Sequence, residues 1–301
     1  MCSEVGVKLI IKENRLVSSY SQLEKFEKCP NSWALRYISK NKVDVKSKHL
    51  EYGLALHETL EFIFNDTRSK YKIPLPFVYD LYNYNFNKRN IPFDNEIEEM
   101  EWRMEGMITL ESLILQQTTF DQLLMGSKII GVEMPFEIPI HVDGLKLADC
   151  FFNTENLASS LVDYDTVYIK GFIDLVVETE QGIIVIDHKS GGKVFDKHKL
   201  TTDLQFPIYG MAINSLLGKY PIKYYYNFTR LHKSQIVEVN EQRIKDENER
   251  IIADFKKMGR GKYTARPTPL CYWCDYSRYK TGICLKSSTW KPKPKEDKKI
   301  A

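Results

Sequence analysis

The chain has 301 residues, of which 43% are hydrophobic and 28% charged, a composition typical of globular proteins and not of disordered or fibrous ones. No stretch approaches the roughly 20 apolar residues that a helix needs to span a membrane, which excludes an integral membrane protein. The 43 Lys and Arg residues against 40 Asp and Glu residues leave a formal charge of +3, too small to identify or exclude an anionic partner.

The N-terminus lacks the basic segment, apolar run and small-residue cleavage site of an export signal. We therefore expect a cytoplasmic protein, or one in the host cytoplasm if it is viral. In that reducing compartment the six cysteines are thiols or metal ligands and not disulfides.

The first half of the chain is expected to be helical. Ser21 and Glu24 have the spacing of a capping box, which predicts a helix that begins there, breaks at Pro30 and resumes beyond it. Apolar residues at helical spacing predict further helices over 52–64 and within 95–124. No strand is expected between 73 and 93.

Strand character dominates the second half. We expect strands over 129–140, 167–177, 183–188, 223–228 and 235–239. A helix over 204–217 tolerates Pro207 if that residue lies in the first turn, and a polar helix covers 241–258. The fold class is therefore α/β, with a helical N-terminal region (1–128), a core (129–258), a cysteine-rich segment (259–289) and a disordered basic tail (290–301).

The segment from Gly171 to Gly192 is expected to form a hairpin that carries two acids. A turn at Glu180 and Gln181 pairs Thr179 with Gly182 and also places Asp174 opposite Asp187. Like charges at such a separation repel, and a divalent cation bound by both carboxylates compensates them. The alternation of side chains puts Lys189 on the face of Asp187 and turns His188 away.

Two acids and a lysine at one point suit phosphodiester hydrolysis. The cation polarises the phosphate and acidifies a water molecule, and the lysine orients that water or stabilises the developing charge. The alternative is a surface hairpin with unrelated charges, which fits poorly because the apolar strand Ile183 to Ile186 ends abruptly in Asp-His-Lys.

These residues resemble the motif of the PD-(D/E)XK nuclease superfamily, with Asp174 as its first acid and Asp187-His188-Lys189 as its (D/E)-x-K element. Further elements resemble the RecB and AddB type and the CRISPR-associated exonucleases. In chain order they are His57, Glu133, Gly171 and the helix segment that carries Gln205 and Tyr209.

The resemblance implies a mixed central sheet flanked by helices, and a Mg²⁺ or Mn²⁺ site formed by His57, Glu133, Asp174 and Asp187. It places Gln205 and Tyr209 close to the substrate. Each element has an alternative interpretation. In these alternatives His57 is an ordinary helix histidine, Glu137 is the third carboxylate in place of Glu133, and the side chains of Gln205 and Tyr209 pack in the core.

A basic loop from Lys193 to Lys199 follows two glycines. It is expected to track a nucleic-acid backbone, with Phe195 available to stack on a base. The alternative is a solvated run of charges.

Three cysteines near the C-terminus, Cys271, Cys274 and Cys284, have the spacing C-x2-C-x9-C, one short of the four ligands of a zinc ion or iron–sulfur cluster. Cys29, next to Pro30, supplies the fourth. The resemblance implies a [4Fe–4S] cluster, and structural zinc is the alternative. Cys2 and Cys150 are expected to be ordinary cysteines.

The leading hypothesis is a metal-dependent DNA nuclease, an exonuclease that acts on single strands or free ends, with the 5′ to 3′ direction implied by the resemblance alone. The rival is a nuclease-fold module that binds DNA or serves as a scaffold for a helicase or recombination partner. No G-x-x-x-x-G-K-[ST] motif occurs, so any ATP-driven unwinding must come from a partner.

Overall fold

The computed structural model describes residues 11–12, 15–39, 41, 43, 47–65, 73–115, 117, 122–124, 127–145 and 165–291. The chain divides into two compact units, each assembled from separate segments. The central unit comprises Lys46–Ile138 and Lys170–Asn248, and the terminal unit comprises Met1–Val45, Pro139–Ile169 and Glu249–Ala301. None of the helices in the described ranges is both long and apolar enough to cross a membrane.

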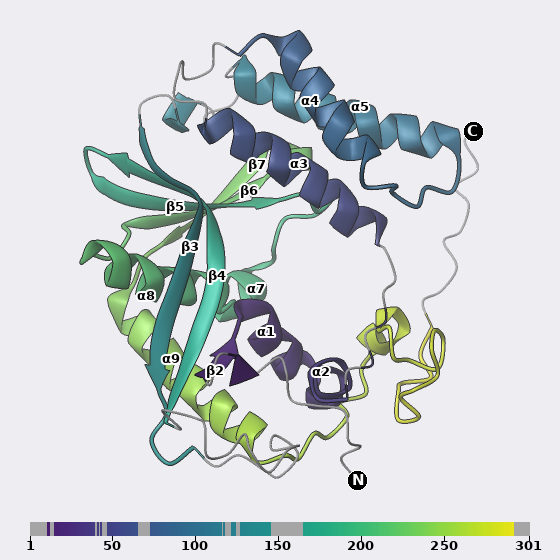
Figure 1. The fold of residues 1–301 in the computed structure, drawn as a ribbon, viewed down its shortest axis with the longest axis vertical. Helices are drawn as coiled ribbons and strands as arrows, with labels where there is room; N and C mark the ends of the chain where they lie inside the picture. The colour runs from purple at the N-terminus through teal and green to yellow at the C-terminus, as the bar shows by residue number, and fades with distance from the viewer. Residues whose placement is uncertain are drawn as a thin grey trace. The chain divides into compact units, whose positions relative to one another are not determined.

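A mixed β-sheet forms the middle of the central unit (Figure 1). Strands β4 and β5 pair antiparallel, β5 and β6 parallel, and β6 and β7 antiparallel, while β3 pairs with β4. The strands are β3 (Lys128–His141), β4 (Thr166–Thr179), β5 (Gly182–Lys189), β6 (Lys223–Phe228) and β7 (Lys233–Glu238). Gly171 is required on β4 because a Cβ there would lie 2.7 Å from the ring of Phe136 on β3.

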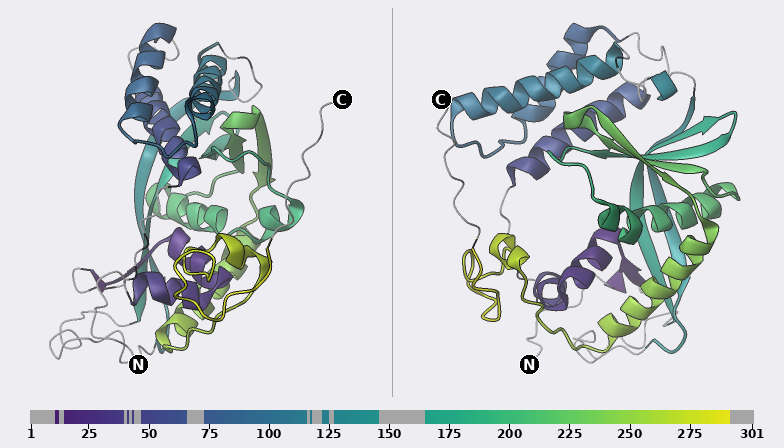
Figure 2. Two further views of the ribbon diagram at one scale, coloured as in Figure 1. Left: turned by 90° about the vertical axis from the view of Figure 1, so that its right-hand side faces the viewer. Right: turned by 180° about the vertical axis from the view of Figure 1, so that it is seen from behind.

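Three helices cover one face of this sheet: α3 (Lys48–Asn65), α4 (Leu75–Asn87) and α5 (Glu96–Ile114). They lie alongside one another in both views of Figure 2. Leu56 and Leu60 of α3 join a buried cluster with Leu175 and Ile186 of the sheet. Burial of such side chains contributes about 1.5–3 kcal/mol each, which fixes α3 against the strands that carry the acids.

The opposite face is covered by α8 (Gln205–Leu217), which follows the short helix α7 (Lys197–Thr202). Phe206 stacks on Tyr224 of β6, with ring centroids 4.4 Å apart and planes 7° from parallel. Pro207 lies in the first turn of α8, where its missing N–H costs nothing. Helix α8 therefore presents Gln205 and Tyr209 to the end of β5.

The terminal unit contains the strands β1 (Ile11–Lys12) and β2 (Arg15–Ser18), and β2 pairs parallel with the first residues of β4. Trp33 is fully buried among the rings of Phe26, Tyr37 and Tyr263. The remaining elements are α1 (Tyr20–Lys28), α2 (Pro30–Tyr37), most of α9 (Glu241–Gly259), the 3₁₀ helix η4 (Pro269–Trp273) and, in the central unit, the 3₁₀ helix η3 (Thr229–Leu231).

The α/β fold class and the five strands predicted from the sequence are confirmed, and one local prediction needs correction. Helix α1 is capped by Ser19, whose side chain accepts a hydrogen bond from the Gln22 N–H, so the capping box at Ser21 is wrong. The segment 73–93 contains helix α4 and no strand, as expected, and Pro74 and Pro76 lie at the start of that helix, where proline is favourable. Residues 292–301 of the predicted disordered tail, Cys2 and Cys150 lie outside the described residues.

Candidate metal centre and active site

The predicted hairpin register is confirmed. Thr179 pairs with Gly182, and the pairing continues to Leu175 with Ile186. Asp174 and Asp187 are the next residues along the two strands. Burial raises the pKa of the Asp174 carboxyl to about 7, and the neighbouring charge of Asp187 adds to this effect. The two acids therefore interact at the end of the hairpin.

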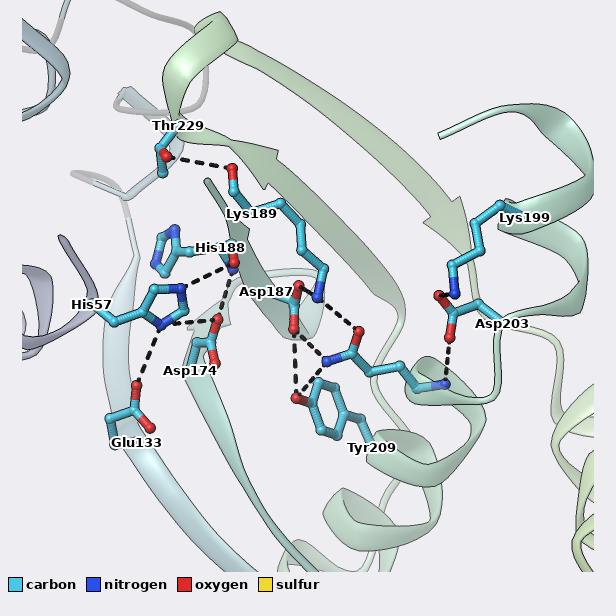
Figure 3. Close-up of polar contacts among 11 residues, drawn as sticks. His57, Glu133, Asp174, Asp187, His188, Lys189, Lys199, Asp203, Tyr209 and Thr229 are labelled. Carbon is cyan, nitrogen blue, oxygen red and sulfur yellow. Dashed lines mark hydrogen bonds and ion pairs between the residues drawn. The ribbon is translucent and has the colours of Figure 1, made fainter. Parts of the chain in front are cut away.

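Three side chains from different elements of the central unit converge on one point (Figure 3). His57 comes from α3, Glu133 from β3 and Asp174 from β4, and one ligand atom from each lies within 4.8 Å of the others. His57 Nδ1 is 3.7 Å from both Glu133 Oε1 and Asp174 Oδ2. Ligands of one Mg²⁺ lie about 2.1 Å from the ion and hence up to about 4.2 Å apart, so both separations from His57 Nδ1 suit a single divalent cation.

The main chain of His188 orients two of these three groups. Its N–H donates to Asp174 Oδ2 at 2.7 Å, and its carbonyl accepts from His57 Nε2 at 3.1 Å. Because Nε2 is occupied as a donor, His57 directs Nδ1 at the carboxylates. A histidine that donates from one ring nitrogen while the other faces a metal is the usual arrangement of a histidine ligand.

Without a metal, His57 and Asp174 bind protons at higher pH than these side chains do in water. Burial disfavours a charged His57, but the hydrogen bond with Glu133 and the charges of Asp174 and Asp187 outweigh it and raise the pKa of His57 to about 9. Burial and the charges of His57 and Lys189 lower the pKa of His188 to about 3, so its ring is neutral. A cation must therefore displace protons from His57 and Asp174.

Metal binding should accordingly strengthen with pH. The folded, metal-free site binds more protons than the unfolded chain between about pH 4 and pH 9, since both pKa values are raised on folding, so the stability of the metal-free protein falls as pH rises in that range. The affinity for Mn²⁺ should rise by up to about tenfold per pH unit for each proton displaced. Titration of Mn²⁺ by electron paramagnetic resonance at pH 6.5, 7.5 and 8.5 measures this, and an affinity independent of pH would contradict it.

Glu133 has a strained backbone. Its φ of 43° lies in the left-handed region, which residues with a side chain rarely adopt. The alternation of buried and exposed side chains in β3 begins only after this position. Such strain costs about 1–3 kcal/mol and is found preferentially at functional sites.

The strain at Glu133 predicts that a glycine variant is more stable there than an alanine variant, the reverse of the usual order in a strand. In the metal-free protein, Glu133→Gly should be more stable than Glu133→Ala by about 1 kcal/mol, because only glycine relieves the left-handed φ. Glu137, on the same strand with no such φ, serves as the control, and there alanine should be the more stable variant. Urea denaturation in chelator measures both pairs, and the same preference at both positions would refute the strain.

Asp187 belongs to a second group of side chains. Lys189 Nζ lies 2.6 Å from Asp187 Oδ2, and Gln205 Nε2 donates to Asp187 Oδ1 at 2.6 Å. Gln205 Oε1 accepts from Lys189 Nζ at 2.9 Å, and Tyr209 Oη donates to Asp187 Oδ1 at 3.5 Å. Gln205 thus bridges both members of the Asp187–Lys189 ion pair.

The predicted site residues therefore meet in two adjoining groups. Asp187 lies outside the set of three close ligand atoms, and in the metal-free protein its carboxylate contacts Lys189 and Gln205. Its place among the metal ligands stays a prediction. The side chains of Gln205 and Tyr209 both contact Asp187, a role that sequence reasoning did not assign.

The positions of Glu133, Glu137 and Phe195 bear on two alternatives that the sequence left open. Glu137 pairs with Lys170 at 2.7 Å, whereas Glu133 faces His57, in agreement with the choice of Glu133. Phe195 packs edge-on against Tyr226 and Phe228, with ring centroids 4.7 Å and 5.2 Å apart. The expectation that Phe195 is available for a base is therefore not supported, since its ring belongs to an aromatic cluster of the protein.

Supporting residues that the sequence did not reveal fix the ends of these elements. Asp203 accepts a hydrogen bond from the Gln205 N–H at 2.9 Å and so positions the start of α8. Thr229 donates to the Lys189 carbonyl at 3.3 Å, and Asn227 Nδ2 lies 3.1 Å from His188 Nδ1. A polar residue between Tyr226 and Phe228 in strand β6 was the available signal for Asn227.

The four predicted cysteines line one cavity of about 390 Å³ in the terminal unit. Cys29 lies at the junction of α1 and α2, and the other three follow in and after η4. Three of the sulfurs accept N–H hydrogen bonds at 3.4–3.5 Å: Cys29 from Arg266 N–H, Cys271 from Thr268 N–H and Cys284 from Asn31 Nδ2. Such bonds are characteristic of thiolate ligands and tune the clusters they hold.

The positions of these sulfurs can be compared with the geometry of a zinc site. A zinc ion with bonds of about 2.3 Å holds its four sulfurs about 3.8 Å apart. Among the described residues, no set whose ligand atoms all lie within 4.8 Å of one another includes these cysteines. The four sulfurs therefore do not have the close spacing of a tetrahedral zinc site.

Comparison with known proteins agrees with this geometry. A model of the PD-(D/E)XK nuclease superfamily matches residues 17–279. The chain therefore belongs to this superfamily, and its mixed sheet flanked by helices is consistent with the fold. It is also similar to an ATP-dependent helicase/nuclease subunit of Clostridium novyi (strain NT), with 27% identity over 149 residues, which is 44% of this chain and 11% of that relative. The chain thus spans only a small part of that protein.

Proposed function

We propose that the chain is a divalent-metal-dependent deoxyribonuclease, and that it degrades single-stranded DNA from free ends. The observation that carries the proposal is the convergence of His57, Glu133 and Asp174 beside the Asp187–Lys189 pair. The first three side chains, joined by Asp187, would hold Mg²⁺ or Mn²⁺. A bound cation of this kind withdraws electron density from the scissile phosphate and makes a nearby water molecule more acidic.

Lys189 would act as a cation in this reaction. Burial disfavours its charged form, but the charge and hydrogen bond of Asp187 outweigh it and raise the pKa of Lys189. A lysine that stays protonated cannot serve as the general base at neutral pH. It would orient the attacking water through its N–H groups and stabilise the negative charge that develops on the phosphate.

Gln205 and Tyr209 would position this lysine. Both are buried, and their hydrogen bonds hold Asp187 and Lys189 in one arrangement. A transition state is stabilised most by groups that need no rearrangement during the reaction. The sequence predicted that these two residues lie close to the substrate. In this proposal they act on the reaction only by holding Asp187 and Lys189 in place.

The four-cysteine cavity would hold a [4Fe–4S] cluster. The shared cavity and the N–H bonds to three sulfurs support a metal group held by the four cysteines. The family resemblance favours a [4Fe–4S] cluster over a single zinc ion. Cys29 and Cys284 are 255 positions apart in the sequence, so the cluster would join the two ends of the terminal unit. Its role is structural in this proposal.

A protein partner would supply unwinding. The similar protein from Clostridium novyi is named as a helicase/nuclease subunit, and the present sequence has no phosphate-binding loop of the G-x-x-x-x-G-K-[ST] type. We propose that a helicase delivers the single strand to this nuclease.

The requirement for a free end can be tested with one DNA molecule in two forms. Circular single-stranded DNA should survive with Mn²⁺ while the same molecule, linearised, is degraded. Blocking the 5′ end should slow degradation, and blocking the 3′ end should not, because the family resemblance implies the 5′ to 3′ direction. Rapid cutting of the circle would identify an endonuclease, and equal degradation of 5′-blocked DNA would refute the assigned direction.

A further inference from the structure

His188 separates Asp187 from Lys189, yet its ring lies on the other face of β5. The residue is 5% exposed, and its ring stacks on Phe64 of α3, with centroids 5.8 Å apart and planes 8° from parallel. Asn227 of β6, its direct neighbour in the parallel pairing, holds Nδ1 at 3.1 Å. An amide NH₂ group can only donate, so Nδ1 accepts and the ring proton is on Nε2. The ring is thus fixed by a helix on one side and a strand on the other.

The backbone of the same residue holds two of the proposed metal ligands. Its N–H donates to Asp174 at 2.7 Å, and its carbonyl accepts from His57 at 3.1 Å. Any rotation of this peptide segment would move both ligands at once. Metal sites tolerate displacements of only about 0.5 Å, so the orientation of this segment matters for the affinity of the site.

Towards the C-terminal end of β5, the pairing with β6 extends further along the strand than the pairing with β4. The β4–β5 pairing extends to Leu175 with Ile186, whereas the β5–β6 pairing continues to Lys189 with Phe228. At His188 the N–H that would face β4 is bound to the Asp174 carboxylate instead. The contacts of the ring with Phe64 and Asn227 therefore stabilise the strand end that carries the site.

We propose that His188 and Asn227 form a positioning pair that sets the geometry of the metal site through the His188 backbone. This inference rests on the proposed nuclease function and adds to it two residues that touch neither the cation nor the DNA. The hydrogen bond to Asn227 fixes the ring, the ring fixes the peptide segment, and the peptide segment orients His57 and Asp174.

The test replaces Asn227 with leucine, which removes the hydrogen bond and keeps the volume. Ser234→Val is the matched control, because Ser234 is the next residue in the same cross-strand row and lines, with His188 and Asn227, a cavity of about 530 Å³ in the central unit. The Asn227→Leu variant should bind Mn²⁺ about 10–100-fold more weakly, the range for lost supporting contacts of a metal site, while Ser234→Val stays within twofold of the wild type. Excess Mn²⁺ should restore most of the cleavage rate of Asn227→Leu.

A second measurement needs no metal. In the metal-free wild type, ¹⁵N spectra of the histidine rings should show His188 with its proton on Nε2, and this signature should be lost in Asn227→Leu. His188→Phe, which keeps the stack on Phe64, is a second variant in case Asn227→Leu does not fold, and it should weaken Mn²⁺ binding similarly.

The outcomes separate this inference from the proposed function. If the wild type binds Mn²⁺ and folded Asn227→Leu or His188→Phe binds it within twofold as tightly, the positioning role is refuted, even if the variant melts at a lower temperature. Weakened binding in Ser234→Val to the same extent would also refute it, since the effect would then not depend on His188. A wild type that neither binds Mn²⁺ nor cuts DNA would overturn the nuclease assignment, and the positioning pair with it.

Discussion

Lys189→Ala should lower the rate of DNA cleavage by about 10²–10³-fold, the usual cost of removing one group that stabilises transition-state charge. The affinity for Mn²⁺ should not fall, because Lys189 is not a ligand and its removal only frees the carboxylate of Asp187 for the cation. DNA binding should also persist, since one ammonium group contributes little to a contact with many phosphates. Single-turnover cleavage of labelled DNA at saturating Mn²⁺ measures the rate.

The control for this variant is Lys219→Ala, an exposed lysine of the central unit that pairs with Glu178 at 3.3 Å. It has the same change of charge and should cut DNA at the wild-type rate. Cleavage by Lys189→Ala at that same rate would exclude the proposed role of the lysine in the reaction.

Cys29→Ser should abolish the metal centre of the terminal unit. Anaerobically purified wild-type protein should be brown and contain about four iron atoms per chain, as a [4Fe–4S] cluster requires. Loss of one of the four ligands should remove the colour as completely in Cys29→Ser as in Cys274→Ser, and should lower the thermal stability, because a bound metal group stabilises the folded state.

The controls for the cluster are Cys2→Ser and Cys150→Ser, which should stay brown. Iron analysis and the visible absorption spectrum decide the outcome. A colourless wild type with one zinc per chain would replace the cluster by zinc, and a wild type with neither metal would contradict the four-ligand site.

The central part of the site could be predicted from sequence because its geometry is local. A two-residue turn at Glu180 and Gln181 fixes the register of the hairpin, and the register alone brings Asp174 near Asp187. The alternation of a strand then puts Lys189 beside Asp187 and turns His188 away. These predictions depend on neighbours in the sequence and not on packing.

The supporting contacts could not be predicted because they join elements that are distant in the chain. Gln205 reaches Asp187 only when α8 packs on the sheet, and its choice between core and site depends on that packing. The His188 backbone holds His57 across 131 positions of sequence, and no side-chain pattern records a backbone acceptor. The left-handed φ of Glu133 is likewise invisible in a sequence that has glutamate, and not glycine, at that position.

The most direct test of the central claim is the digestion of end-labelled single-stranded DNA by the wild-type protein with Mg²⁺, Mn²⁺ or chelator, beside Asp174→Asn under the same conditions. Asp174→Asn keeps the size of the side chain and removes the charge that faces His57. The account predicts cleavage by the wild type with either cation, none in chelator and none by Asp174→Asn. Undiminished cleavage in chelator or by Asp174→Asn, or no cleavage by the wild type with either cation, would contradict a metal-dependent nuclease at this site.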